Sequence, residues 1–429
     1  MSVIWGQSTI SSFRKEIGQD DYQWNNYYLK EILALSSGKP CPKNKSDSPT
    51  ETNRVPVFGS NGIYGYVQDH LVDYPTICIG RVGASGVINR TPNITWITDN
   101  ALFVEKIRED IVHLPYLYYL LNYIDLSKYQ KKSGQPLVTQ TDILSIRISL
   151  PSLNDQRQVA TVLATVDEAI AATGRVIEIT VELKKELLNC VFKPEFWRVR
   201  STIHAIYQDS WRLIKIDDIK AEKRNAISLG PFGSDLTSEF YKNFGVPVLR
   251  GKNLSKMKVN FENLVYVSES KADELRSSNV FPNDIIITYR GTLGQVSLLQ
   301  NPLPWHRCVI SQSLMKISCN ERIVNPEYIL QYLKSPAGQK KILSYKGHTG
   351  VPALGNPITS IKQLQVPLPS LPQQDYIVEI LSTVDDGLAT ERAERDRLIT
   401  LKKGLMQVLL TGRVRVPPGV AEEVMPAHV

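Results

Sequence analysis

The sequence predicts an α+β protein in which two similar globular modules are joined by two long helices that form an antiparallel intramolecular coiled coil. The first observation is a repeat. The segment that begins Leu150-Pro-Ser-Leu153 recurs without a gap 218 residues later, at Leu368-Pro-Ser-Leu371, with about a third of its positions identical. The second is helical periodicity in both copies, and the third is a weaker repeat upstream of each copy. Because two copies at so long a period do not make a solenoid, we expect two similar halves.

The repeats divide the chain into five segments. At 429 residues the chain is long enough for two or three domains, each with its own core. We expect residues 1–149 to form the first module and residues 150–204 the first helical repeat. Residues 205–367 then form the second module, residues 368–415 the second helical repeat, and residues 416–429 a flexible tail.

Each repeat has the pattern of one long helix. Proline at the second position of Leu-Pro-Ser-Leu prevents helix before it, and the serine that follows is a suitable cap. Downstream, residues spaced alternately by three and four form a coiled-coil seam of about four heptads, or roughly 40 Å of helix. The first seam contains Leu163, Val166, Ile170, Thr173, Ile177, Thr180, Lys184, Leu187 and Val191; the second contains Leu381, Val384, Leu388, Glu391, Arg395, Leu398, Lys402, Leu405 and Leu409.

A single seam needs a partner, and the other copy in the same chain is the nearest one. The module between the two helices is large enough to allow either orientation. We expect antiparallel pairing, because it places the modules at opposite ends around a pseudo-two-fold axis, whereas parallel pairing would crowd them at one end. Polar seam residues such as Glu391 and Arg395 would fix the register. Two unrelated core helices remain the alternative.

The modules share two features that can carry function. In each, an apolar strand ends in an arginine, Arg81 or Arg290, just before a glycine turn. In each, a tyrosine-rich helical segment is followed by a Lys/Gly stretch, at residues 131–135 and 346–350. The tyrosines recur at helical spacing, which favours core or rim positions over base-stacking positions. They are Tyr116, Tyr118, Tyr119, Tyr123, Tyr328 and Tyr332.

Composition excludes several classes of protein. No apolar run is long enough to span a membrane, and the first residues lack a signal-peptide pattern. The five scattered cysteines include no CxxC pair, which indicates a reduced cytoplasmic protein without disulfides or structural zinc. Residues 205–367 carry 21 Lys and Arg against 13 Asp and Glu, whereas residues 1–150 carry 15 against 14. A basic second module suits a polyanion, although an ordinary basic surface explains the charge equally well.

The repeated motif is the pattern by which the chain resembles a known family. Its residues are Leu150, Pro151, Leu153, Gln156 and Asp167 in the first copy, and Leu368, Pro369, Leu371, Gln374 and Asp385 in the second. A Leu-Lys-Lys-x-Leu stretch follows near each helix end. Over nearly its whole length the chain resembles the specificity (S) subunits of type I restriction–modification systems. One departure is Asp375, where the first copy has Arg157, which raises the question of whether both helix starts dock identically.

The resemblance implies a binding protein rather than an enzyme. S subunits have two target recognition domains, and each reads one half of a split, asymmetric site in double-stranded DNA. Their helical repeats act as a spacer and dock two methyltransferase (M) subunits, which restriction/motor (R) subunits can join. The resemblance thus implies that this chain has no catalytic residue, metal or cofactor of its own. The residues expected to serve in spacing and docking are Gln156, Leu163, Val166, Asp167, Ile170, Leu187, Gln374, Leu381, Val384, Asp385, Leu388 and Leu405.

Two groups of side chains are candidates for contacting DNA. Arg81 and Arg290 can each pair with guanine or bind a phosphate, or instead tie down the turn. In the second group, lysines would bind phosphates while Gln135 or His348 reads a base; a solvated helix end is the alternative. This second group contains Lys128, Lys131, Lys132, Ser133, Gln135, Lys340, Lys341, Lys346, His348 and Thr349.

No catalytic motif accompanies these candidates. The Asn/Asp-Pro-Pro-aromatic motif of adenine methyltransferases is absent, and the histidines are few and unclustered. Residues 245–253 depart from a phosphate loop in spacing and in their final residue. Two other classes stay open: a DNA-modifying enzyme of unfamiliar type, which methyl transfer by the isolated chain would support, and a stand-alone coiled-coil adaptor, which assembly independent of DNA would support.

Overall fold

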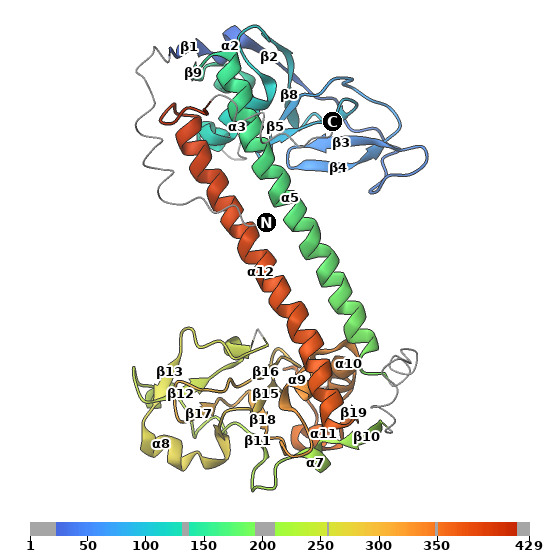
Figure 1. Ribbon diagram of the computed structural model, residues 1–429, viewed down its shortest axis with the longest axis vertical. Helices are drawn as coiled ribbons and strands as arrows, with labels where there is room; N and C mark the ends of the chain where they lie inside the picture. Colours follow the sequence, from blue (N-terminus) through green and yellow to red (C-terminus); the bar gives the residue numbers. More distant parts are fainter. Residues whose placement is uncertain (1–22, 131–136, 194–210, 255–256, 348–350, 418–429) are drawn as a thin grey trace. The chain divides into compact units, whose positions relative to one another are not determined.

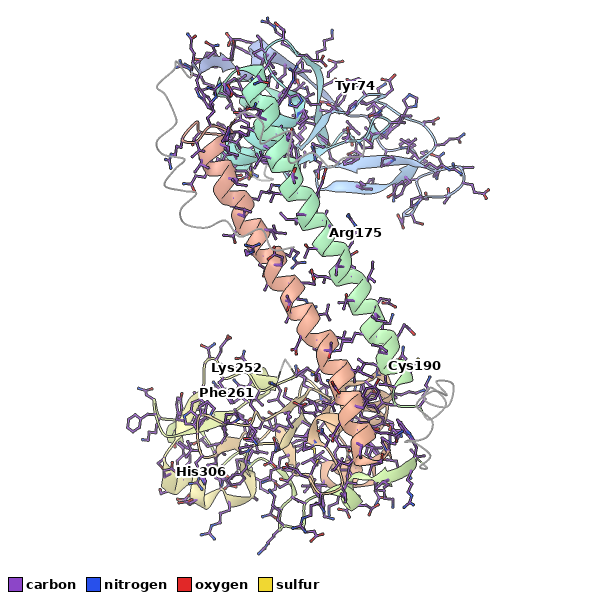
Figure 2. The ribbon with its side chains drawn as sticks, in the orientation of Figure 1. Tyr74, Arg175, Cys190, Lys252, Phe261 and His306 are labelled. Carbon is purple, nitrogen blue, oxygen red and sulfur yellow. The ribbon has the colours of Figure 1, made fainter. Side chains whose placement is uncertain are left out.

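The computed structural model describes residues 23–130, 137–193, 211–254, 257–347 and 351–417 (Figure 1). The chain divides into two compact units, and each combines one module with part of each long helix. Unit 1 comprises residues 1–174 and 393–429, and unit 2 comprises residues 175–392. The first division falls within α5 (Leu153–Cys190): Figure 2 shows Arg175, the first residue of unit 2, partway along that helix and Cys190 at its end.

Module 1, the part of unit 1 that precedes α5, contains two sheets and a closing pair of strands. The larger sheet is antiparallel, with the order β2-β8-β5-β6, and the smaller has the order β4-β3-β7, with a parallel β3–β7 pair. The larger sheet contains β2 (Leu33–Ser37), β8 (Ala101–Ile107), β5 (Ile77–Gly80) and β6 (Ile88–Arg90). The smaller contains β4 (Gly62–Val67), β3 (Val55–Gly59) and β7 (Trp96–Ile97). The closing pair is β1 (Asn25–Tyr28) with β9 (Arg147–Leu150), and the helices are α2 (Leu29–Ile32), α3 (Leu114–Ile124), η1 (Leu126–Tyr129) and α4 (Gln140–Leu144).

Module 2, the part of unit 2 between α5 and α12, repeats this topology. Its larger sheet has the order β11-β18-β15-β16, and its second sheet has the order β13-β12-β17-β14 with a parallel β12–β17 pair. The strands are β11 (Ile227–Leu229), β18 (Leu314–Ile317), β15 (Ile285–Thr288), β16 (Val296–Leu298), β13 (Val265–Val267), β12 (Val246–Leu249), β17 (Cys308–Ile310) and β14 (Asn279–Val280). The closing pair is β10 (Arg212–Lys215) with β19 (Gln365–Leu368). The helices are α7 (Ile216–Ile219), η3 (Ser238–Phe240), η4 (Gly251–Leu254), α8 (Glu269–Glu274), η5 (Arg276–Ser278), α9 (Pro326–Lys334), α10 (Pro336–Ser344) and α11 (Pro357–Gln363).

The core of each unit joins its module to the long helices. In unit 1, the core around α3 includes Leu163 from the first half of α5 and Leu409 from the end of α12 (Leu371–Leu409). In unit 2, the core around α9 includes Val191, just after α5, and Leu381 from the first half of α12. The prediction that the module tyrosines are core residues is confirmed for the four that are fully or almost fully buried: Tyr116, Tyr119, Tyr328 and Tyr332.

The two long helices are the predicted coiled coil, and they pair in antiparallel fashion. In unit 1 the start of α5 packs with the end of α12, and in unit 2 the end of α5 packs with the start of α12. Every predicted seam position in both helices is buried or half-buried. The helices have 38 and 39 residues, or about 57 Å each at 1.5 Å per residue. They exceed the expected length because each begins about three turns before the first seam residue.

Two further observations concern the chain as a whole. Among the described residues, no helix is both long and apolar enough to cross a membrane. Val416, the first residue of the segment expected to be a flexible tail, is buried in the core of unit 1, while residues 418–429 lie outside the described part.

Candidate nucleic-acid interface and helix joints

A tight glycine turn follows one of the two inner strands of the larger sheet in each module. The turn after β5 has positive φ at Gly83 and Gly86, and the turn after β15 has positive φ at Gly291 and Gly294. Only glycine adopts this conformation without strain, so the sequence pattern determines the turn locally. A glutamine from the second helical segment after the turn holds each turn: Gln130 directly follows η1, and Gln339 lies in α10. The Gln130 side chain donates to the Ser85 carbonyl at 2.7 Å, and the Gln339 side chain donates to the Gly294 carbonyl at 2.9 Å.

The backbone register shows that Arg81 and Arg290 do not occupy equivalent positions. The Gly86 amide donates to the Gly80 carbonyl, and the Gly294 amide donates to the Thr288 carbonyl in the same way. Gly80 therefore corresponds to Thr288, and the equivalent of Arg81 is Tyr289 rather than Arg290. Adjacent residues of an extended chain point to opposite faces, so the two arginines are presented differently. Arg81 is half-buried, whereas Arg290 is exposed.

The segment that follows the Lys/Gly stretch packs against this turn in both modules. In module 1, Val82 forms a β-bridge with Leu137, and the Val138 amide donates to the Arg81 carbonyl at 3.1 Å. In module 2, Arg290 forms a β-bridge with Ala353. The described segments that follow the second predicted zone thus lie beside the glycine turn that contains the first. The predicted residues Lys131, Lys132, Ser133, Gln135, His348 and Thr349 lie outside the described part of the chain.

The remaining predicted lysines differ in their surroundings. Lys128 and Lys340 are exposed on η1 and α10, and Lys128 lies 3.9 Å from Asp125. Lys346 is exposed on the strand-like segment that bridges to Leu354. Lys341 instead donates to the Gln365 carbonyl at 2.9 Å and lies over the Tyr332 ring, so its ammonium stabilises module 2 itself.

A third loop, which is not among the candidates predicted from the sequence, borders the glycine turn. In module 1 it is the β3–β4 hairpin turn: a Cβ placed on Gly80 would lie 2.4 Å from the Ser60 carbonyl oxygen. In module 2 the corresponding connection begins at η4, where a Cβ on Gly251 would lie 3.9 Å from the Thr288 methyl group. The signal available in the sequence was Asn61-Gly62, a dipeptide typical of hairpin turns.

The repeated glutamines fix the start of each long helix to its module. The Gln156 side chain accepts from the His113 amide at 2.9 Å and donates to the Ile111 and Pro151 carbonyls, each at 2.9 Å. Both Gln156 and Gln374 have no exposed surface. They therefore act within the chain, because no part of either side chain is left for a docked partner. The Gln374 side chain has the equivalent bonds, from the Asn325 amide at 2.9 Å and to the Ile323 and Pro369 carbonyls at 3.3 and 2.9 Å.

The residue after each glutamine, Arg157 or Asp375, makes a different contact in the two units. In unit 2, Asp375 accepts a hydrogen bond from the Asn325 side chain at 2.8 Å. In unit 1, burial and the charge of Arg157 lower the pKa of His113, the residue in the position of Asn325. The glutamine bonds are therefore the same in both joints, and the charged contact beside them differs.

The repeated aspartates join the two long helices by reciprocal ion pairs. In unit 1, the Asp167 carboxylate on α5 lies 2.6 Å from the Lys402 ammonium on α12. In unit 2, Asp385 on α12 pairs with Lys184 on α5. Because Asp385 is the repeat of Asp167 and Lys402 is the repeat of Lys184, each helix supplies one acid and one base. This reciprocity determines the antiparallel register.

The surroundings of the two ion pairs are not identical. Tyr119 of module 1 donates a hydrogen bond to Asp167 at 2.9 Å, and burial together with this carboxylate raises the pKa of Tyr119. In unit 2, Lys334 of module 2 faces the Asp385–Lys184 pair instead. Burial, followed by the charge of Lys184, lowers the pKa of Lys334, while Asp385 partly offsets this shift.

Two observations on the described residues concern metal ligands and thiols. These residues contain no group of three or more His, Cys, Asp or Glu side chains placed to hold a metal ion. Burial raises the pKa of Cys78, Cys308 and Cys319 to about 12, so these thiols are not activated nucleophiles. Each module presents a cluster of three loops at its pair of sheets.

The fold and these loops define a protein with two related but non-identical binding modules. The chain belongs to the Type I restriction modification DNA specificity domain family, whose profile matches it twice, over residues 22–182 and 211–400. It is 27% identical to the MjaX type I restriction enzyme specificity subunit of Methanocaldococcus jannaschii, over 94% of this chain and 97% of that protein. The MjaVIII specificity subunit of the same organism is 24% identical, over 72% of each chain.

Solved structures agree with this fold. The crystal structure of a type I restriction–modification S subunit from M. genitalium has a TM-score of 0.60 and 17% identity, and the match covers 92% of this chain and 98% of that one. The family and the fold, including two recognition domains, were both predicted from the repeated motif and are confirmed.

Proposed function

We propose that this chain is the non-catalytic DNA-reading subunit of a type I restriction–modification complex, in which each module reads one half of a bipartite, asymmetric site in double-stranded DNA. The observation that carries the proposal is the repeat of one loop cluster on two modules with different side chains. Arg81 and Tyr289 occupy one position of the cluster, and Val82 and Arg290 the next. The two loop clusters share a backbone arrangement but present different side chains, which suits a DNA site whose two halves differ in sequence.

The five segments take the following roles in this proposal. Residues 1–149 and 205–367 are the two target recognition domains, residues 150–204 and 368–415 are the spacer, and residues 416–429 are a tail whose first residue, Val416, packs in the core of unit 1. The DNA contacts lie in the loop clusters, where exposed lysines bind phosphates and set the register while arginine and amide side chains reach base edges. The proposed contact residues are Arg81, Lys128, Lys131, Lys132, Ser133, Gln135, Arg290, Lys340, Lys346, His348 and Thr349; Lys341 supports the module beside them.

The helical repeats carry the second part of the proposal, which is docking of two methyltransferase subunits. Leu183 on α5 is 52% exposed, and its repeat, Leu401 on α12, is 47% exposed. One of these leucines belongs to each unit. Two equivalent apolar points on one chain suit two copies of the same partner, because identical subunits require identical contacts. Restriction subunits would join through the methyltransferases, and the adenine methyltransferase and ATP-dependent nuclease activities reside in those partners.

The same helices would set the distance between the half-sites. Half-sites read by a protein with two-fold symmetry are separated by about one helical turn of DNA, 34–36 Å, or by multiples of it. Helices that hold their register through two ion pairs give a spacer of defined length. The free cysteines at positions 41, 78, 190, 308 and 319 are consistent with a cytoplasmic location, where cellular DNA is accessible.

Mapping methylated adenines in cells that express this chain with a methyltransferase partner tests the proposal. We expect one bipartite motif with two different halves. Replacing residues 211–367 with the corresponding module of a relative should change one half of the motif and leave the other half and the spacer length unchanged. The proposal is wrong if both halves change together, or if the purified chain alone methylates DNA and a point mutation within it abolishes this activity.

A further inference from the structure

A fourth loop lies against the glycine turn in both modules and links their two sheets. In module 1 it is the turn Asp99–Asn100 between β7 and β8, and in module 2 it is the turn Gln312–Ser313 between β17 and β18. The Asn100 carbonyl accepts from the Arg81 amide at 2.9 Å, and the Ser313 carbonyl accepts from the Tyr289 amide at 3.1 Å. Both turns therefore belong to the loop cluster already described, and backbone hydrogen bonds hold them there.

The two turns present different side chains at one equivalent position. Asp99 and Gln312 each precede the residue whose carbonyl holds the glycine turn, and both are exposed. Within the described residues, neither side chain takes part in a hydrogen bond or an ion pair. In module 2, the Tyr289 hydroxyl donates to the backbone carbonyl of Gln312 at 2.7 Å, which fixes the turn and leaves the amide side chain available.

An exposed aromatic residue stands beside Gln312. A Cβ on Gly230 would lie 2.0 Å from the Ser311 carbonyl oxygen, and a Cβ on Gly233 would lie 3.1 Å from the Gln312 side-chain oxygen. Phe232, between these two glycines, is 81% exposed. A large aromatic side chain held at this exposure by a close-packed loop is suited to stacking on a flat ligand.

Module 1 has the same close approach without the aromatic side chain. A Cβ on Gly38 would lie 2.2 Å from the Thr98 carbonyl oxygen, so Gly38 corresponds to Gly230. The residue two positions later is Pro40, in the place of Phe232. The backbone arrangement is thus the same in both modules. The side chains at the two positions that could contact a base differ: Asp99 and Pro40 in module 1, and Gln312 and Phe232 in module 2.

We propose that Gln312, flanked by Phe232, reads a base in the half-site of module 2, and that Asp99 reads a different base in the half-site of module 1. This inference rests on the proposed function and deepens it. A glutamine amide both donates and accepts and so matches the N6 and N7 edge of adenine, whereas a carboxylate only accepts and matches the N4 amino group of cytosine. Phe232 stacks on or wedges against a base at the same step.

The test is selection of bound sequences from random duplex DNA by the full chain in complex with its methyltransferase partner. Gln312→Glu should lower the preference for the cognate base pair at one position about 10- to 100-fold and leave the other half-site unchanged. Asp99→Asn should do the same at one position of the other half-site. The matched controls are Gln365→Glu, on the exposed face of β19, and Glu109→Gln, at the opposite end of β8 from Asp99; neither should alter the selected sequence.

The outcomes separate this inference from the proposed function. If the wild-type complex enriches no bipartite sequence, the proposed function itself is wrong. If the wild type enriches one, but Gln312→Glu and Asp99→Asn fold normally and select the same bases, the reading role of this turn is overturned. Phe232→Ala should weaken binding to the half-site of module 2 about 10-fold. Unchanged binding by that variant would overturn the role of the aromatic side chain.

Discussion

The two modules share a backbone frame and differ in what they bury within it. At the positions where unit 1 has Thr76 and Phe103, unit 2 has Asp284 and Lys316, as the β5–β8 and β15–β18 registers show. The Asp284 carboxylate accepts from the Ser318 hydroxyl at 2.5 Å, and the Lys316 ammonium donates to the Asn279 carbonyl at 2.5 Å. The comparison shows that one topology accepts either neutral or ionisable buried groups, provided that each polar atom has a partner.

At the joints between module and long helix, by contrast, the main hydrogen bonds are the same in the two units. Gln156 and Gln374 make the same three bonds in the two units, whereas the residues around the Asp167 and Asp385 ion pairs differ. The hydrogen bonds that attach each long helix to its module are thus the same in both units, because the two helices begin with the same motif. The contacts that vary belong to the side chains each module contributes.

The largest effect is expected when this constant joint is broken. Gln156→Ala and Gln374→Ala each leave one backbone amide and two carbonyls, of which the proline carbonyl is buried, without their side-chain partner, so each should lower the free energy of unfolding by about 2–4 kcal/mol. Urea denaturation measures this, with Gln407→Ala, on the exposed surface of α12, as the control that should change it by less than about 0.5 kcal/mol. A loss in only one of the two variants would contradict the equivalence of the joints.

A smaller effect should distinguish the two ion pairs. Asp167→Asn and Asp385→Asn should each cost about 1 kcal/mol, because both pairs are partly exposed to solvent. Asp385→Asn also removes the carboxylate that faces both Lys184 and Lys334, so added salt should recover more of its loss by screening the two lysines. Urea denaturation at low and high salt checks this, with Asp386→Asn, exposed on α12, as the control. Equal salt dependence of the two variants would show that Lys334 plays no part.

The smallest effect concerns the buried carboxyl group of unit 2. Burial raises the pKa of Asp284 above its ordinary value, so the ionised carboxylate costs stability at neutral pH. As the pH falls through the raised pKa toward the ordinary value of about 4, the wild type should gain stability relative to Asp284→Asn, whose amide does not titrate there. Thermal unfolding of both proteins across this range measures the difference. A wild type that loses stability relative to the variant over the same range would show that the pKa shift has the opposite sign.

The sequence predicted those features of the site that depend on a residue and its neighbours in the chain, and missed those that depend on contacts between distant segments. The glycine turns were predicted because positive φ is a property of the residue itself, but the register between the modules was not. Arg81 and Arg290 both precede a glycine, and only the hydrogen bonds of Gly86 and Gly294 show that they stand one position apart. The turns at Asp99 and Gln312 carry no local signature and become part of the site because other strands bring them there.

The sequence by itself determined the two-fold plan of this protein. A gapless repeat with a three-four seam predicts two long helices, because the heptad pattern is a local consequence of helical geometry. The two modules favour antiparallel pairing, because parallel pairing would crowd them at one end. Only the tertiary structure decided how the motif residues are used. Gln156 and Gln374 lie in the motif but act inside the fold, because the amide of His113 or Asn325 reaches them from more than forty positions away in the chain. Strand order likewise decided which loops lie beside the glycine turn. Pairing between strands that are distant in the sequence brings these loops together, and no spacing in the sequence indicates it.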